Sequence, residues 1–235
     1  MSLIGPLSDV DGELLRGVSG TVHDVRRGEE LLKAGDRPAD VVVVLGGLLQ
    51  RCSMTADGKR QIHSVYIAGD APSLETLRID VIDTTLAALA PSRVALVPHA
   101  ELDRIMQASP NVLALLWRET LIQASIFRTW LVRNSQMLAH AQLAHFFCEI
   151  ITRAGAAGLA KHGCCDLPMT QEDLADALGM TPVHVNRTLM LLRAGGMIEF
   201  HGGRLRVPDR AKLAEVAAFD PAYLHYRQPV GDGSA

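Results

Sequence analysis

A stretch of 27 residues without glycine or proline, 111–137, constrains the fold more than any other feature. Ser109 and Pro110 precede it, and they suit a helix start, because serine accepts a first-turn hydrogen bond and proline needs no N–H there. At 1.5 Å per residue such a helix is about 40 Å long, more than one small domain usually needs. We therefore expect a long helix, placed in residues 109–138, that joins two unlike halves.

Apolar side chains recur along this helix at alternating steps of three and four, with two polar members. One interpretation is a long core helix of a single domain. The other is a helix that pairs with a second copy of the chain and also packs on its own β domain. We favour the homodimer, because the helix lacks a third apolar layer to pack on. The predicted dimer contacts are Leu113, Leu116, Trp117, Thr120, Gln123, Ala124, Phe127, Trp130 and Leu131.

The residues before the helix have the pattern of short antiparallel strands. Apolar runs between Thr21 and Val97 are separated by glycine, aspartate and proline. Val41–Val44 is β-branched at every position, which favours a buried strand. Asp57 and Gly58 lie between two such runs, and glycine tolerates the positive φ of a hairpin turn. We expect residues 1–108 to form an antiparallel β-roll of the double-stranded or jelly-roll kind, a sensor domain in a chain of the α+β class.

Composition narrows the class of protein and the compartment. Apolar residues make up 48% of the 235 residues and the net charge is −3, so any DNA binding must come from a local basic patch. The four cysteines show no CxxC pair or zinc spacing, which fits a reducing cytoplasm. Residues 1–12 show no signal-peptide pattern, and no apolar run can cross a bilayer. We expect a cytoplasmic protein without a membrane partner.

Residues 139–227 carry the pattern of a winged helix-turn-helix. A helix over 139–154 is followed by two short helices around Gly179. Glycine readily adopts the left-handed backbone conformation that such a turn needs. Thr170 begins the first short helix, with Asp173 completing a capping box. Thr181 caps the second. A two-glycine hairpin at 202–203 then predicts the wing. The tail, 228–235, is expected to be disordered.

The second short helix would enter the major groove of double-stranded DNA. Its outward residues begin at Val183, and arginine and asparagine can each form two hydrogen bonds to a base edge. Between residues 181 and 207 there are four arginines and one acid, a local charge of 4 − 1 = +3. A plain pair of helices would explain neither the wing nor its arginines. The predicted DNA contacts are Thr170, Gln171, Thr181, Val183, His184, Asn186, Arg187, Arg204 and Arg206.

With these motifs in view, the chain resembles the Crp/Fnr family of bacterial regulators over nearly its full length. The similarity is carried by Thr-Gln-Glu-Asp-Leu-Ala at 170–175, Gly-Met-Thr at 179–181, Val-Asn-Arg at 185–187, Arg-Gly-Glu at 27–29, Gly-Gly-Leu at 46–48, Asp-Gly-Lys at 57–59 and Gly-Asp at 35–36 and 69–70. The resemblance implies a dimer on palindromic DNA. It also implies contacts from Val183, Asn186 and Arg187. Family members often carry glutamate where Val183 stands, so the half-site should differ.

The effector is expected to differ from cyclic AMP and cyclic GMP. Cyclic-nucleotide binders of this family use a glutamate for the ribose and an arginine with a hydroxyl for the phosphate. Leu74 and Thr84 stand at those positions here, unless Glu75 replaces the acid from one place over, where it would turn to another face. Asp80 and Asp83 lie nearby. Arg78 could compensate only after a rearrangement of its loop. The candidate pocket residues are Gly69, Asp70, Ser73, Leu74, Glu75, Thr84 and Thr85.

Other sensor chemistries and enzyme function find little support in the sequence. An iron–sulfur sensor needs several thiolates, and the first half offers only Cys52. His63 and Cys52 have side chains that can ligate haem, but nothing else in the sequence supports this role. No metal site is predicted. No catalytic triad, carboxylate pair or phosphate loop appears, so we expect no enzyme. The alternatives are a degenerate regulator that needs no effector and a β-roll protein that binds a small molecule or senses redox state. The cofactor stays open, and no motif marks a surface for RNA polymerase.

Overall fold

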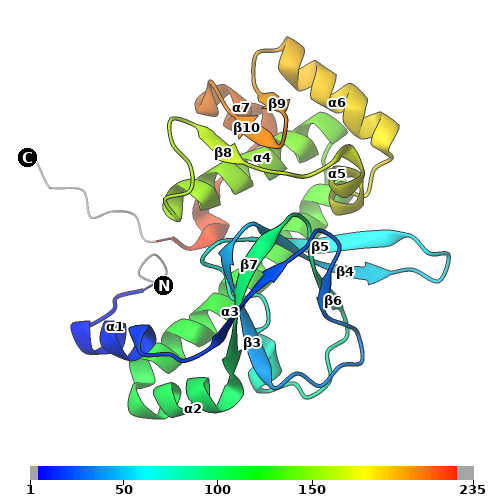
Figure 1. Cartoon of the computed structure of the whole chain (residues 1–235). Helices are drawn as coiled ribbons and strands as arrows, with labels where there is room; N and C mark the ends of the chain where they lie inside the picture. Colours follow the sequence, from blue (N-terminus) through cyan, green and yellow to red (C-terminus); the bar gives the residue numbers. More distant parts are fainter. Residues whose placement is uncertain (1–4, 227–235) are drawn as a thin grey trace, which may run out of the picture.

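The computed structural model describes residues 5–226, and the predicted tail at 228–235 lies outside them. Two layers of structure are joined by one long helix (Figure 1). The lower layer in that view holds the β-roll with the first two helices. The upper layer holds the remaining helices with a small sheet. The long helix α3, Pro110–Gln136, runs between the two layers, as the sequence predicts.

The β-roll consists of two antiparallel sheets. One has the order β1-β7-β3 (Thr21–Val25, Ser92–Pro98, Asp40–Gly46) and the other β2-β6-β4-β5 (Glu30–Leu32, Thr85–Ala88, Leu48–Met54, Arg60–Ile67). Between the sheets a core forms from aliphatic side chains, including Val42 and Val44. The β4–β5 hairpin turns at 55–59 and extends away from the body (Figure 1). The predicted fold class, buried strand and hairpin are confirmed.

Three short helices complete this half: α1 (Asp9–Arg16), the 3₁₀ turn η1 (Leu74–Leu77) and α2 (His99–Ala108). The sequence analysis did not predict α1. Ser8 caps it in a capping box with Asp11. Asp11 also accepts hydrogen bonds from the Ser109 hydroxyl at 2.5 Å and from Asn111 Nδ2 at 2.7 Å. These bonds hold the pKa of the Asp11 carboxyl far below its usual range and attach α1 to the start of α3.

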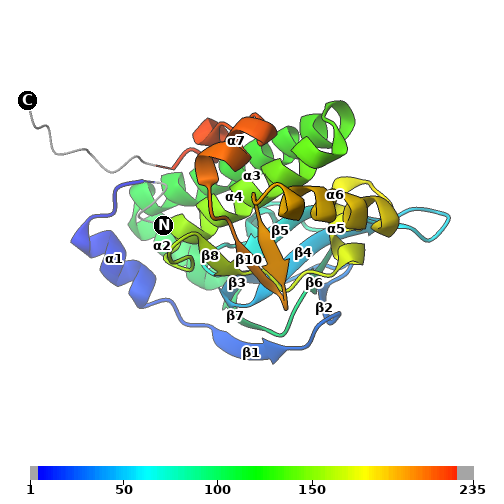
Figure 2. The same cartoon turned by 90° about the horizontal axis from the view of Figure 1, so that it is seen from above.

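The second half follows α3 after two residues. Its elements are α4 (Ala139–Ala156), β8 (Cys164–Asp166), α5 (Gln171–Leu178), α6 (Pro182–Ala194), β9 (Glu199–His201), β10 (Arg204–Arg206), α7 (Arg210–Ala217) and the 3₁₀ turn η2 (Pro221–Leu224). The three strands form an antiparallel sheet in the order β8-β10-β9. Figure 2 shows this sheet beside α5 and α6. Strand β8 and helix α7 were not predicted. No helix of residues 5–226 could cross a bilayer.

Candidate nucleic-acid interface and sensor cavity

Local signals position α6 as the sequence predicts. Gly179 ends α5 in the left-handed region, with φ of 65°. Thr181 then caps α6 by accepting a hydrogen bond from the His184 amide at 3.2 Å, and Pro182 takes the first helical position. The αL glycine reverses the chain sharply, because a residue with a Cβ would be strained there. The two helices therefore meet at a short turn.

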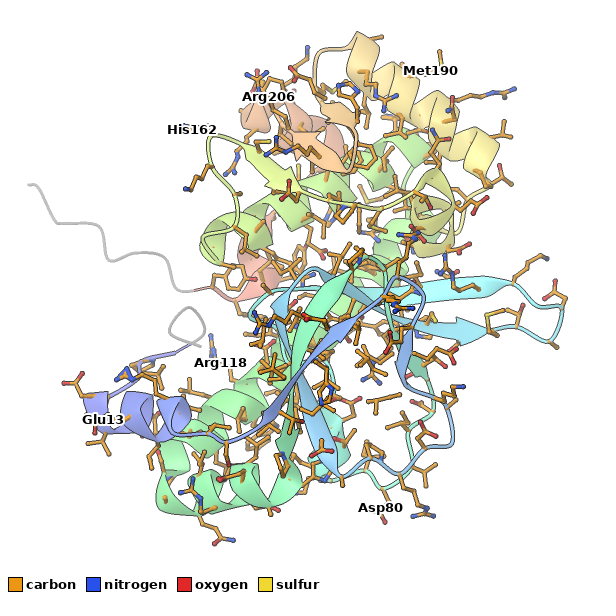
Figure 3. The ribbon with its side chains drawn as sticks, viewed as in Figure 1. Glu13, Asp80, Arg118, His162, Met190 and Arg206 are labelled. Carbon is orange, nitrogen blue, oxygen red and sulfur yellow. The ribbon has the colours of Figure 1, made fainter. Side chains whose placement is uncertain are left out.

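The outer face of α6 is exposed. Val183 and Met190 are 63% and 61% exposed, and His184 and Arg187 are exposed as well. Figure 3 shows Met190 projecting from the outer side of this helix. The opposite side of α6 is fully buried. No acidic residue lies on the helix, so its outer face presents a surface of one charge sign that suits a DNA groove.

Two polar side chains at the base of this face bind each other. Asn186 Nδ2 donates to Gln171 Oε1 at 3.0 Å, which joins α6 to the first turn of α5. The sequence analysis placed Asn186 outward and free to reach a base, whereas in the structure it is half-buried and paired. Its carbonyl oxygen is not used in this bond. Thr170, in contrast, is exposed at the N-terminus of α5.

The wing places two arginines on exposed strand positions, where each pairs with a carboxylate. Arg204 Nε lies 3.1 Å from Asp166 Oδ1, and Arg206 Nη1 lies 2.8 Å from Glu199 Oε1. All four side chains are about half exposed or more, and ion pairs of this kind contribute little to stability. A DNA phosphate can therefore compete for these arginines. The local positive charge is smaller than the sequence count, because Asp166 comes from outside that segment.

The inner face of the helix-turn-helix is attached to the β-roll by ion pairs. Asp173 is 1% exposed and binds both Arg27 and Arg60, the latter at 2.9 Å. Arg60 Nε also lies 2.7 Å from Asp176 Oδ2. Burial would raise the pKa of Asp173, but hydrogen bonds from Arg27 and Thr170 hold it below its usual value. We call these four charged residues, Arg27, Arg60, Asp173 and Asp176, the domain joint.

The long helix α3 has two different faces. Leu116 and Trp130, both predicted dimer contacts, are buried against their own chain, so that part of the prediction is wrong. Trp130 is 2% exposed, and its Nε1 donates to Glu149 Oε2 at 2.8 Å. Gln123 is half-buried and donates to Glu119 at 2.9 Å. The remaining predicted contacts follow steps of four and three and lie on the outer side: Leu113, Trp117, Thr120, Ala124, Phe127 and Leu131. These six residues are the outer seam.

A cavity of about 520 Å³ opens between the β-roll and α3. Arg51 of β4 dominates its polar lining, since its Nη1 donates to Thr84 Oγ1 at 2.9 Å and its Nη2 donates to the Pro72 carbonyl at 2.6 Å. The same guanidinium forms an ion pair with Glu75. We call this space the sensor cavity. The arginine of this cavity, Arg51, therefore already has its charge neutralised by Glu75 of the same chain.

Comparisons with known proteins agree with this architecture. A model of the cyclic nucleotide-binding domain matches residues 22–109, and one of the Crp-like helix-turn-helix domain matches residues 141–216. The chain is 28% identical over 200 residues to the transcriptional activator protein FnrL of Cereibacter sphaeroides, covering 82% of this chain and 79% of the relative. The structure of FixK2 from Bradyrhizobium japonicum aligns with a TM-score of 0.78 at 25% identity, covering 86% of this chain and all of FixK2.

The chain belongs to the Crp/Fnr family. The fumarate and nitrate reduction regulatory protein of Escherichia coli K12 is 24% identical over 193 residues, covering 82% of this chain and 77% of the relative. Crp/Fnr proteins are DNA-binding transcription regulators and not enzymes, and this chain is one of them. In this Crp/Fnr regulator the matched helix-turn-helix model covers both α5 and α6.

The predicted effector residues of this Crp/Fnr chain do not all line the same cavity in the structure. Leu74, Glu75 and Thr84 line the sensor cavity. Ser73 is fully buried and accepts a hydrogen bond from the Val42 amide at 2.8 Å, so it supports the fold instead of a ligand. Thr85 is not among the residues that line the cavity. Gly69 and Asp70 line a different cavity.

Arg51 is a residue of the sensor cavity that the sequence analysis missed. No local motif marks it, and it reaches Thr84 only because strands β4 and β6 pair, with Arg51 opposite Leu86. Arg78, which the sequence analysis considered as a substitute, pairs instead with Asp103 at 3.1 Å. Among residues 5–226 no group of three metal-binding side chains occurs, and all four cysteines are free thiols. Cys164 and Cys165 lie in strand β8, and Cys165 is buried.

Proposed function

We propose that this regulator acts as a homodimer on a two-fold-symmetric DNA site, with α6 of each copy in successive major grooves. The exposed face of α6 is the observation that carries this proposal. In a dimeric helix-turn-helix protein the half-sites lie about one helical turn apart. Arg187 suits a guanine edge, with Val183 and His184 beside it. Arg204, Arg206 and Thr170 would bind phosphates, which position the helix without reading sequence.

The outer seam supports a dimer through α3. Its side chains repeat with the spacing of a coiled-coil contact, and Trp117 is 66% exposed in the single chain. An exposed apolar row of this length costs free energy in water until a second copy covers it. The seam is coupled to the sensor cavity, because Thr120, Ala124 and Phe127 line that cavity as well.

Selection of genomic DNA fragments by the purified protein tests the function. The expected result is enrichment of a palindromic sequence whose affinity falls steeply with salt. Enrichment of no common sequence would contradict the proposal. Such a protein works in the cytoplasm, where it has access to the chromosome. If it activates transcription, RNA polymerase is a further partner.

The dimer has its own test. Phe127→Asp places a charge in the seam and is expected to convert the dimer to a monomer at micromolar concentration, as measured by sedimentation equilibrium, and to weaken operator binding. Val10→Asp, on an exposed apolar position of α1, is the matched control and should leave the dimer intact. A monomeric wild-type protein, or a dimeric Phe127→Asp variant, would refute the seam.

We further propose that the sensor cavity does not bind cyclic AMP or cyclic GMP tightly. A cyclic phosphate would have to displace Glu75 from Arg51, and Asp83 also lines the cavity. Removing the partner of a half-buried carboxylate is unfavourable. Calorimetry is expected to show no binding of either nucleotide at micromolar concentration, and a micromolar dissociation constant would overturn the proposal.

A further inference from the structure

A second cavity lies where the two halves of the chain meet. Its volume is about 490 Å³, within the range of roughly 300–1,000 Å³ typical of small-molecule sites. Its walls come from residues 67–71 at the end of β5, from α3, from the C-terminal end of α4 and from Tyr226. It shares a few residues with the sensor cavity but lies over Arg153 and not over Arg51. We call it the interdomain cavity.

Arg153 is the most unusual residue in this lining. It is 1% exposed, and its Nη2 lies 2.7 Å from Asp70 Oδ2 of the β-roll. Its Nη1 lies 3.3 Å from Glu149 Oε1 of its own helix. Its Nε is buried and has no hydrogen-bond partner within residues 5–226. A buried donor without an acceptor costs free energy, so a ligand with a hydroxyl or carbonyl oxygen would relieve that cost.

Negative charge is in excess around the cavity. In its lining Asp70 and Glu119 supply two carboxylates against the single guanidinium of Arg153. Glu119 forms no ion pair in the described chain, and its one hydrogen bond comes from Gln123 Nε2 at 2.9 Å. Burial raises the pKa of both Asp70 and Glu119, because a desolvated carboxylate favours its neutral form. A cation beside Glu119 would offset this desolvation.

Apart from Gln123 and Tyr226, the rest of the lining is apolar and includes Ile67, Leu116, Ile122 and Ile126. We propose that the interdomain cavity binds a small protonated amine with an apolar body and a hydrogen-bond acceptor. The ammonium group lies at Glu119, the acceptor oxygen faces Arg153, and the apolar body contacts the isoleucines. An anion would meet the carboxylates of Asp70 and Glu119, and a purely apolar molecule would leave Glu119 without a counter-charge and Arg153 Nε without an acceptor.

The location of the site suggests how the ligand acts. Asp70 belongs to the β-roll and Arg153 to the DNA-binding half, so a ligand that contacts both changes the free energy of their contact. An amine that binds more tightly to one arrangement of the halves therefore changes DNA affinity, and by linkage DNA changes amine affinity by the same factor. This second step depends on the proposed function, whereas binding of the amine does not.

Calorimetry with three matched probes tests the site. The probes are 2-amino-1-phenylethanol, the neutral 1-phenyl-1,2-ethanediol and the anionic mandelate, which share ring and hydroxyl and differ in charge. The amine is expected to bind about tenfold or more tighter than the diol, as a charge-assisted hydrogen bond would give, and mandelate is expected not to bind. Equal affinities for amine and diol, or no binding of the amine at millimolar concentration, would overturn the proposal.

Two variants and a control locate the binding. Glu119→Gln keeps the hydrogen bond with Gln123 and should reduce amine affinity to that of the diol. Ala156→Phe fills the cavity from its rim and should abolish binding of both probes. Glu13→Gln, on the exposed side of α1 (Figure 3), is the control and should bind like the wild type. Unchanged amine affinity in Glu119→Gln would refute the site.

DNA affinity, measured on the same samples, separates this proposal from the proposed function. Tight DNA binding without amine binding refutes the cavity assignment and leaves the regulator intact. Amine binding that depends on Glu119, together with no sequence-specific DNA binding, supports the site and refutes the proposed function. Amine binding that leaves DNA affinity unchanged supports the site and refutes its coupling to DNA.

Discussion

The two helices of the helix-turn-helix, α5 and α6, have opposite charge and opposite surroundings. Glu172, Asp173 and Asp176 all lie on α5, and two of them bind arginines of the β-roll. Helix α6 carries two arginines and no acid, and its outer face is exposed. The two helices of one motif therefore have different roles. Helix α5 attaches the motif to the sensor domain, and α6 is left available for DNA.

The largest expected effect is the loss of the carboxylate at the centre of the domain joint. Asp173→Ala removes a helix cap and leaves Arg27 and Arg60 without their shared partner. We expect it to lower the free energy of unfolding by about 2–3 kcal/mol, because both arginines are partly exposed and water replaces some of the interaction. Urea unfolding at pH 7 measures this. Glu172→Ala, exposed on the same helix, should change stability by less than about 0.5 kcal/mol.

The pH dependence of the joint gives an independent measurement. Because the pKa of Asp173 is lowered in the folded protein, its contribution is present above the unfolded pKa of about 3.9 and is lost as pH falls through the lower, folded value. The difference in stability between the wild type and Asp173→Asn should therefore be constant from pH 7 to 5 and shrink below about pH 4. A difference that grows in acid would contradict the assigned direction.

An intermediate effect is expected on the DNA side of the comparison. Arg187→Ala should weaken operator binding by about 1–3 kcal/mol and relax selectivity at one base pair, without changing the urea midpoint. Fluorescence anisotropy with single-base operator variants measures both quantities. Unchanged operator affinity would mean that α6 enters the groove in another orientation, and a large loss of stability would mean that α6 also holds the fold together.

The smallest expected effect concerns the wing. Arg206→Ala should weaken binding to all DNA sequences alike and reduce the slope of log affinity against log salt by about one. Stability should change little, because the pair with Glu199 is exposed. The control is Glu199→Ala, which frees Arg206 and should leave the slope unchanged or increase it. A loss of sequence selectivity in Arg206→Ala would show that the wing reads bases.

The sequence predicted the DNA-binding half well because its signals are local. The turn at Gly179, the caps at Thr170 and Thr181 and the two-glycine wing turn each depend on residues within four positions of one another. Their geometry is set by φ preferences and by hydrogen bonds to nearby amides. The same holds for the 55–59 hairpin and for the start of α3.

Local sequence signals could not predict contacts between segments that are distant in the chain. Asp173 was identified as a cap, but its pairing with Arg27 and Arg60 joins segments more than 100 residues apart in the chain. Arg51 meets Thr84 through strand pairing, and Trp130 turns inward because Glu149 accepts its indole N–H. Apolar residues occur on both faces of α3, and only packing against α2, α4, β5 and the 3₁₀ turns distinguished the covered face from the outer seam.

Residue order alone thus determined where α3, α5 and α6 begin and which turns are tight, since these follow from interactions along one segment. The tertiary structure decided which charges neutralise each other, which arginine reaches the sensor cavity and which apolar row of α3 stays exposed. Those outcomes depend on distances between segments, and the free energy of an ion pair or a buried side chain is set by its surroundings in space and not by its neighbours in the chain.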